Sequence, residues 1–412
     1  MSNIFNIAII GAGPAGMMAA ISAKKSSNRV CILEKNISFG NKLLLSGKGR
    51  CNVTSSKDIH DIVKAFGKEG KFLYGVLSQY SNQDLIKFFE DRGVKLKVER
   101  GDRVFPVDNK ASAILDCLVN EIKKKNIDIF NNFDVNKVIK KKNLFEISCS
   151  KGTVFSKRLI ISTGGKSYPG TGSTGAGYEF ARQLGHIIEE PIPALVPLIV
   201  EDNDLNSLAG LSLKNVELSF LSKNKIFSKE FGEMLFTHRG ISGPIVLKLS
   251  KGVYQKLENG NQVFANIDLK PKLDERTLRK RIIREIQNAP KKEYQSLLAT
   301  LLPRLLIAYA INITGIDKHL QSSILSKEQI TSLINFLKKF SFEINKVESI
   351  NKAIVTHGGI NIQEIERKTM ESKIIPGLYF AGEIICLDGP TGGYNMQKAF
   401  STGFVAGKFS SL

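Results

Sequence analysis

The chain has 412 residues, of which 42% are hydrophobic and 24% are charged, and its formal net charge is +20. This length predicts two or three domains, and the composition argues against a disordered or fibrous protein. The five cysteines include no C-x-x-C pair, so we expect neither a disulfide framework nor a metal site, and the pattern fits a reducing, cytoplasmic environment.

The first apolar run, residues 7–23, is interrupted by three glycines and a proline. It therefore predicts neither a signal peptide nor a membrane-spanning helix. Residues 6–10 are typical of a short buried strand, and the glycine-rich segment 11–16 (GAGPAG) follows directly. Residues 17–25 are patterned as a helix and 29–33 as a second strand that ends at Glu34.

This strand–helix–strand order is typical of a dinucleotide-binding unit, in which a pyrophosphate lies at a helix N-terminus. The glycines permit the turn and the close approach of the backbone to the ligand. A carboxylate at Glu34 can accept the ribose hydroxyls and would repel a 2′-phosphate, so the site suits FAD or NAD and not NADP. The predicted contacts are Gly11, Gly13, Pro14, Ala15, Gly16, Glu34 and Lys35.

Residues 40–54 (GNKLLLSGKGRCNVT) contain too many glycines and polar side chains for a core element. Two explanations of Cys51 stay open: the neighbouring cation favours a thiolate, which would make it a reactive thiol or a proton donor, or it only packs against the cofactor. The predicted contacts in this segment are Lys42, Ser46, Gly47, Gly49, Arg50, Cys51 and Asn52.

Residues 112–126 are patterned as a helix, and residues 127–160 as a lysine-rich strand meander. The apolar run 159–162 predicts a strand that stops at Thr163, Gly164 and Gly165. These three residues are further predicted contacts. A second G-x-G-x-x-G, at 170–175, does not directly follow a strand and does not predict a nicotinamide site. The composition changes after residue 193. Short alternating segments up to residue 269 predict an antiparallel β insert, and 271–340 are patterned as helices.

Two features of the insert carry functional alternatives. His238, in the polar loop 237–244, either protonates a substrate or forms a hydrogen bond within the loop, and the second is the commoner case. A helix near residue 280 has a basic face that either binds RNA phosphates or is simply solvated, again the commoner case. The RNA-binding candidates are Arg276, Arg279, Lys280, Arg281 and Arg284.

The C-terminal segment 377–412 is patterned as a strand, a glycine-rich loop and a helix. A second helix N-terminus with small residues suits a flavin ring, because the helix dipole stabilises negative charge on the reduced ring. This second helix N-terminus therefore predicts FAD, and not NAD, as the bound cofactor. The predicted contacts are Gly382, Glu383, Asp388, Gly392, Gly393, Tyr394, Asn395 and Gln397.

Together these motifs resemble the BaiN-like, aminoacetone-oxidase-like family of FAD-dependent oxidoreductases. The resemblance covers nearly the whole chain and is carried by residues 11–16, 46–54, 162–178, 235–244 and 377–403. Two residues depart from the family pattern: Ala176 stands where an acidic residue is expected, and Lys398 where an aromatic residue is usual.

The resemblance implies an α/β fold with a discontinuous, two-dinucleotide-type, Rossmann-like FAD domain, an inserted β-barrel-like domain and a helical subdomain. The corresponding ranges are 1–190 with 357–412 for the FAD domain, 191–270 with 341–356 for the β domain, and 271–340 for the helical subdomain.

The resemblance also implies an activity, because members are described as amine oxidases, as reductases of bile-acid-type enones and as a ribosomal RNA dihydrouridine synthase. The net charge suits the last of these, since a basic surface attracts polyanions, although an AT-rich gene would also raise the lysine content. We therefore expect NAD(P)H-reduced FAD to reduce a uridine of 23S rRNA, with Cys51 or His238 as the acid. The alternative is a small-molecule flavoenzyme without an RNA substrate.

Overall fold

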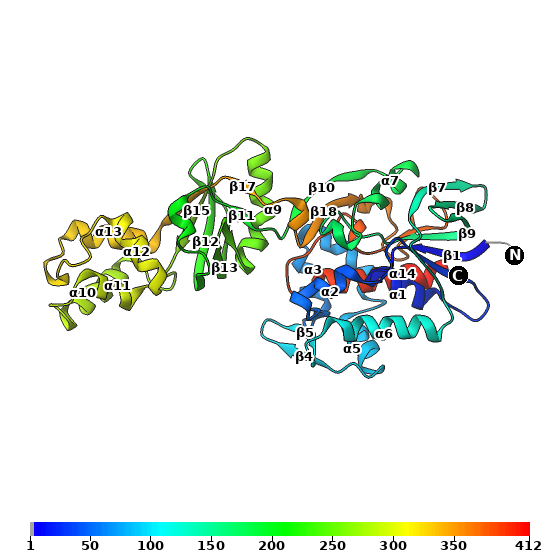
Figure 1. Cartoon of the computed structure of the whole chain (residues 1–412), viewed down its shortest axis with the longest axis horizontal. Helices are drawn as coiled ribbons and strands as arrows, with labels where there is room; N and C mark the ends of the chain where they lie inside the picture. Colours follow the sequence, from blue (N-terminus) through cyan, green and yellow to red (C-terminus); the bar gives the residue numbers. More distant parts are fainter. Residues whose placement is uncertain (1–3) are drawn as a thin grey trace. The chain divides into compact units, whose positions relative to one another are not determined.

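The computed structural model describes residues 4–412 and divides into two compact units (Figure 1). The first unit runs to Pro193 and resumes at Ile350–Leu412, so it contains both ends of the chain. The second unit is Ala194–Ser349. Each unit has its own buried apolar core. The predicted discontinuous domain with an insert is confirmed.

The first unit is built on a seven-stranded sheet whose strands follow the order β6-β2-β1-β9-β8-β7, with β19 also paired to β9. Pairing is parallel between β6, β2, β1, β9 and β19. Pairing is antiparallel between β9 and β8 and between β8 and β7. Their bounds are β1 Ile4–Ile10, β2 Val30–Glu34, β6 Asp128–Asn131, β7 Val135–Lys141, β8 Leu144–Cys149, β9 Gly152–Ile161 and β19 Leu378–Phe380.

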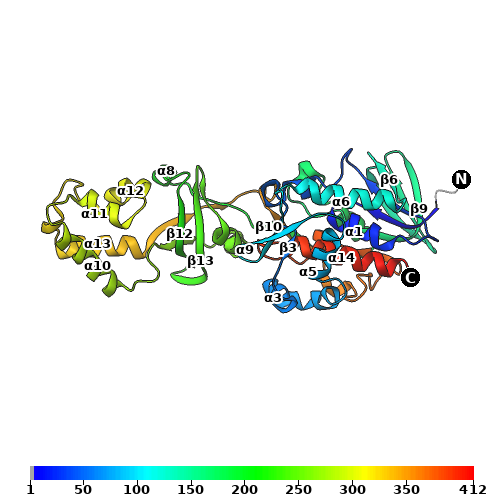
Figure 2. The same cartoon turned by 90° about the horizontal axis from the view of Figure 1, so that it is seen from below.

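Two helices from opposite ends of the chain pack together beside this sheet, α1 (Pro14–Ala23) and α14 (Tyr394–Ser410) (Figures 1 and 2). Their backbones approach closely because α14 carries glycines on the contact face. A Cβ at Gly403 would lie 2.2 Å from the Ala15 carbonyl oxygen, and one at Gly407 would lie 2.1 Å from that of Ala19. Nearly every residue of α1 is buried, as expected of a helix that is apolar all round.

The other elements of the first unit cover the sheet and the loops at its carboxyl edge. A small antiparallel sheet has the order β3-β5-β4, and β10 pairs with β18. The helices are α2 Asn41–Leu45, α3 Ile59–Ala65, α4 Tyr74–Leu77, α5 Asn82–Glu90, α6 Ala111–Lys124 and α7 Ala176–Gln183, and the strands are β3 Thr54–Ser55, β4 Leu96–Glu99, β5 Arg103–Pro106, β10 Ile188–Ala194 and β18 Val355–Ile360.

The second unit contains an antiparallel seven-stranded sheet with the order β16-β15-β12-β13-β14-β11-β17. The short strands β11 and β17 pair and bring the two ends of the unit together. The strands are β11 Leu198–Ile199, β12 Ser212–Ser222, β13 Lys225–Thr237, β14 Gly240–Ser242, β15 Val263–Asp268, β16 Phe340–Ile344 and β17 Lys346–Val347.

The helices of the second unit share one core with its sheet. Leu278 and Ile282 of α10 are fully buried in the same cluster as Ile267 and Phe340 of the strands. The predicted separation of residues 271–340 as a subdomain stays a prediction. The helices are α8 Asn203–Asn206, α9 Pro244–Glu258, α10 Glu275–Asn288, α11 Tyr294–Leu301, α12 Arg304–Thr314 and α13 Lys327–Lys338. Within residues 4–412, no helix combines the length and apolar character needed to cross a membrane.

Candidate active site

The carboxyl ends of β1, β2, β9 and β19 lie at one edge of the first unit's sheet. Parallel pairing places Ile10 beside both Leu33 and Ile161, and Ile161 beside Phe380. The glycine-rich segments that follow β1, β9 and β19 therefore meet at this edge, where open α/β sheets bind their ligands. Residues predicted as contacts from both ends of the sequence are brought together here.

The N-terminus of α1 has the geometry of a phosphate site. Its N-cap is Gly13, no side chain caps it, and a Cβ at Gly13 would meet no atom within 4 Å. The other two glycines serve packing: a Cβ at Gly16 would lie 1.9 Å from the Gly11 carbonyl oxygen, and one at Gly11, where φ is +99°, would lie 2.8 Å from that of Ser162. Helix N–H groups that no side chain caps, beside the open space at Gly13, fit a pyrophosphate.

Glu34 lies at the end of β2, next to this turn, and is buried. Its two carboxylate oxygens accept hydrogen bonds from the Ala12 N–H at 2.7 Å and from the Asn36 N–H and side-chain amide at 2.9 and 2.8 Å. A carboxylate has further lone pairs for ribose hydroxyls. Asn36 was not among the predicted contacts. Lys35 donates to the Thr174 hydroxyl at 3.0 Å.

A polar cluster joins Lys42 and Glu383, which are 341 positions apart in the sequence. The Lys42 ammonium donates to Glu383 and to the Ser167 hydroxyl, each at 2.6 Å. Glu383 also accepts from the Ser167 hydroxyl at 3.0 Å and from the Thr356 N–H at 2.8 Å. Burial opposes ionisation of Glu383, but the Lys42 ammonium, the Thr356 N–H and the Lys398 charge together outweigh it, and the pKa of the carboxyl is lowered. The cluster is an ion pair at the carboxyl edge of the sheet.

Ser167 and Thr356 are cluster members that the sequence did not predict. Thr356 also accepts from the N–H groups of Lys166 and Ser167 at 2.9 and 3.1 Å, and so fixes the loop after β9. A Cβ at Gly165 would lie 2.4 Å from the Thr356 hydroxyl. The buried Thr163 hydroxyl has no partner among residues 4–412, and it lies against Gly177, where a Cβ would be 2.0 Å from it.

The loop before α14 is closed by its own polar side chains. Gly389 and the Asn395 amide exchange two hydrogen bonds, of 2.9 and 2.7 Å. Gly393, the N-cap of α14, has a φ of +93°, and a Cβ there would lie 2.4 Å from the Thr54 carbonyl. No side chain caps this helix either. The Thr54 hydroxyl donates to the Gln397 amide oxygen at 2.5 Å, so this bond joins segments 40–54 and 392–397.

Cys51 is fully buried, and burial raises the pKa of its thiol to about 12. The Arg50 guanidinium pairs with Glu99 and with Asn109 and stacks on the Phe105 ring at 4.2 Å, so it is engaged away from the thiol and the thiolate form loses the cation that would favour it. The two remaining alternatives, a proton donor and a thiol that packs in the site wall, stay predictions. The glycines around it, Gly47 and Gly49, have φ angles of +57° and +84°.

Asp388 and Lys398 lie near the same loop. The Asp388 carboxylate is 2.5 Å from Nδ1 of His357 in β18. Lys398 is buried within α14, and its ammonium donates to the Leu387 carbonyl oxygen. Neither Lys398 nor His357 was predicted as a contact. The sequence marked Lys398 only as a departure from the family pattern, in which an aromatic residue is usual at this position.

His238 and the five RNA-binding candidates belong to the second unit. His238 is exposed at the turn between β13 and β14, and its role stays a prediction. On α10, Arg276, Lys280 and Arg284 are exposed, whereas Arg279 and Arg281 are half-buried.

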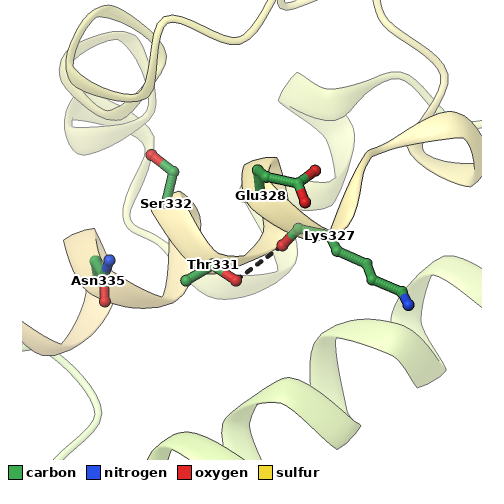
Figure 3. A pocket seen from close by; sticks show the side chains of 5 residues that line it. All are labelled: Lys327, Glu328, Thr331, Ser332 and Asn335. Carbon is green, nitrogen blue, oxygen red and sulfur yellow. Dashed lines mark hydrogen bonds between the residues drawn. The ribbon is translucent and has the colours of Figure 1, made fainter.

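Arg279 is engaged within the unit, because its guanidinium donates to the Thr331 hydroxyl of α13 at 2.7 Å. Thr331 lines a surface hollow of about 390 Å³ together with Lys327 and three other α13 residues, and its own hydroxyl donates to the Lys327 carbonyl at 2.8 Å (Figure 3). Arg279 is therefore held against α13, and the exposed basic face of α10 consists of Arg276, Lys280 and Arg284.

Comparison with known proteins identifies the family. The model of the HI0933-like protein Rossmann domain matches residues 5–409. A Haemophilus influenzae protein named ribosomal RNA dihydrouridine synthase is 32% identical over 98% of each chain, and a Clostridium scindens protein named 3-dehydro-bile acid delta(4,6)-reductase is 30% identical over 98% of each chain.

Solved structures of enzymes share the fold. The chain superposes on a flavocytochrome c3 fumarate reductase with a TM-score of 0.53 and 18% identity, covering 99% of this chain and 78% of that one. For a 3-ketosteroid delta1-dehydrogenase from Sterolibacterium denitrificans the TM-score is 0.54 at 11% identity, with full coverage of both chains. The chain thus belongs to the HI0933-like family, and it is an FAD-dependent oxidoreductase.

Proposed function

We propose that this enzyme uses NAD(P)H-reduced FAD to reduce a carbon–carbon double bond, and that its substrate is a uridine of 23S ribosomal RNA, in the cytoplasm. Two relatives named ribosomal RNA dihydrouridine synthase, from Haemophilus influenzae and Escherichia coli, are each 32% identical over at least 96% of both chains. The observation that carries the RNA part of the proposal is the distribution of charge in the second unit.

The cofactor would lie along the carboxyl edge of the first unit's sheet. Gly13 and the N-terminus of α1 would hold the pyrophosphate, Glu34 the adenosine ribose, and the uncapped N-terminus of α14 the polar edge of the flavin ring. FAD supplies hydride-transfer chemistry when bound. The Lys42–Glu383 ion pair would keep the loops after β9 and β19 in place at this edge.

The basic charge of the second unit is concentrated in one stretch. Residues 270–304 contain 10 Lys and Arg against 4 Asp and Glu, whereas the rest of residues 194–349 contains 13 against 12. A gene-wide enrichment in lysine would raise the charge throughout the unit. A local excess on a surface is instead the electrostatic footprint expected of a nucleic-acid-binding site.

Helix α10 presents part of this excess on one exposed face. Arg276, Lys280 and Arg284 follow one another at four-residue steps, which places them on the same side of the helix. The opposite side, with Leu278 and Ile282, is buried in the unit's core. The Asp274 side chain caps the helix through the Thr277 N–H at 2.6 Å, which stabilises its first turn. Three exposed cations at this spacing would bind RNA phosphates.

A binding and turnover experiment tests this proposal. Reduced enzyme is incubated with an unmodified 23S rRNA transcript, and mass spectrometry follows conversion of uridine to dihydrouridine. Replacing Arg276, Lys280 and Arg284 by Gln should reduce the salt dependence of RNA affinity, with the slope of log K against log salt smaller by about 2 to 3. The matched control replaces Lys214, Lys223 and Lys225, exposed cations of the same unit outside residues 270–304. These substitutions should change the salt dependence of RNA affinity and the turnover much less than the α10 substitutions do.

The Clostridium scindens relative supports a second candidate, reduction of a small-molecule enone. That function predicts NAD(P)H consumption driven by a steroid-type enone, unaffected by added RNA and by the α10 substitutions. Absence of dihydrouridine after prolonged incubation with rRNA, together with such turnover, would replace the first proposal by the second.

A further inference from the structure

Lys398 is buried in the protein interior, where lysine is seldom found. Only 2% of its surface is exposed, and it lies in the second turn of α14. Its ammonium donates to the Leu387 carbonyl oxygen. A buried ammonium is unfavourable unless opposite charges and hydrogen bonds compensate for lost hydration. The charges and hydrogen bonds around Lys398 therefore decide whether it stays protonated.

The loop between β19 and α14 is attached to α14 through Lys398 and Asn395, which are three positions apart. Lys398 holds Leu387, and Asn395 holds Gly389 through two hydrogen bonds. Asp388, between these two points, is held from the other side by His357 of β18 at 2.5 Å. The loop ends at Gly393, the N-cap of α14. Lys398 thus anchors the backbone that leads into the helix N-terminus.

The charges around Lys398 form a balanced group. Glu383 and Asp388 favour its protonated form, as does Cys386 to a smaller degree, and Lys42 opposes it. Lys42 is itself bonded to Glu383 at 2.6 Å. Burial outweighs the carboxylates and lowers the pKa of Lys398 to about 8. The side chain is therefore mostly charged at neutral pH and loses its proton within the range in which the protein is studied.

We propose that Lys398 is a positioning residue for the cofactor: it anchors the loop 387–393 and places a positive charge within the first two turns of α14 that raises the midpoint potential of bound FAD. The inference rests on the proposed cofactor position at this helix. Reduction adds negative charge to the flavin, and a cation in a protein interior interacts with that charge more strongly than one in water. Removing the cation makes reduction less favourable.

The test is a redox titration of the purified holoenzyme, without substrate, between pH 6 and pH 9.5. Lys398→Met should lower the midpoint potential at pH 7. In the unsubstituted enzyme the potential should fall more steeply above about pH 8, because reduction there draws an additional proton onto Lys398. Lys398→Met should lose this steeper region, so its difference from the unsubstituted enzyme should shrink as the pH rises.

Two further variants separate charge from structure. Lys398→Arg keeps a cation that does not titrate, and should retain the potential without the steeper region. Lys408→Met removes an exposed lysine from the last turn of the same helix and should leave the potential unchanged. If Lys398→Met does not fold, the test rests on Lys398→Arg. A slope of midpoint potential against pH that equals the slope of the unsubstituted enzyme above about pH 8 would contradict the proposal.

A Lys398→Met potential and pH profile equal to those of the unsubstituted enzyme would overturn the inference while leaving the cofactor in place. Failure of the unsubstituted protein to retain FAD would instead overturn the proposed function together with this inference. A negative result with rRNA bears on neither measurement, because the titration contains no substrate.

Discussion

At the scale of single residues, burial determines the protonation state of the groups around the cofactor site. It keeps the Cys51 thiol neutral, with a pKa raised to about 12, and it brings the Lys398 pKa down to about 8. Glu383 is the exception, because Lys42, the Thr356 N–H and Lys398 together outweigh burial and keep the pKa of the carboxyl low. These residues therefore comprise an ion pair, a neutral thiol and one lysine whose pKa is lowered to about 8.

The cysteines supply a prediction at this scale. All five are free thiols, and burial raises the pKa of each of them. Because the thiolate is the reactive form, native protein at pH 8 should react with Ellman's reagent about 100-fold more slowly than an exposed thiol. The partly exposed Cys149 should react first. Five thiols should become titratable on unfolding.

The same reasoning applies to catalysis. Cys51→Ala should keep its FAD content and its turnover within about threefold, since a thiol of this pKa is a weak acid and a poor nucleophile. A fast-reacting native thiol, or a complete loss of turnover in a Cys51→Ala protein that still holds FAD, would show that Cys51 is ionised or acts as the proton donor after all.

At the scale of elements, contact between α1 and α14 joins the two ends of the chain. The helices meet through small residues, and their separation is set by Gly403 and Gly407. Gly382 belongs to the same contact, because a Cβ there would lie 2.8 Å from that of Ala15. Both helix N-termini proposed to face the cofactor are positioned by this packing.

Gly403→Ala should therefore cost about 3 kcal/mol of stability, because its Cβ would meet a backbone oxygen that cannot move independently of α1. The melting temperature of the first unit should fall by about 6 °C or more, and FAD content should fall with it. Gly252→Ala in α9 is the matched control, since its nearest neighbour would be 3.7 Å away. It should be neutral or stabilising by up to about 1 kcal/mol. Equal effects of the two substitutions would contradict the packing argument.

At the scale of the whole molecule, two separate cores predict two unfolding events. The second unit has its own core, and its ends meet where Leu198 pairs with Val347 and the Glu348 N–H donates to the Pro197 carbonyl at 3.0 Å. The first unit carries the whole proposed cofactor site. A ligand stabilises only the part of a protein that binds it.

Calorimetry of the full chain should accordingly resolve two transitions. Saturation with FAD, at about 100 times its Kd, should stabilise the first unit by about 2.7 kcal/mol and raise one transition only. The fragment 194–349 should fold alone, with a melting temperature equal to that of the unaffected transition. A single transition that moves as a whole with FAD, or an unfolded fragment, would show that the two cores are not independent.

The sequence alone determined the order of the elements and the chemistry that surrounds the cofactor. Local rules suffice for that: a strand followed by Gly11, Gly13 and Gly16 requires a tight turn and a helix, and the spacing to Glu34 is set by the length of one helix and one strand. The same rules identified the glycine-rich loop before α14 and the alternating strands of the insert. Each of these signals is formed by residues that lie close together along the chain.

Tertiary structure alone decided which of those side chains meet and which stay protonated. Lys42 finds Glu383 across 341 positions, and Arg50 turns to Glu99 instead of to Cys51. In the sequence Lys398 stands out only as a departure from the family pattern, and only the packing of α14 shows that it is enclosed. Pairings over such separations and pKa shifts caused by burial depend on how the whole core closes, and no local pattern contains that information.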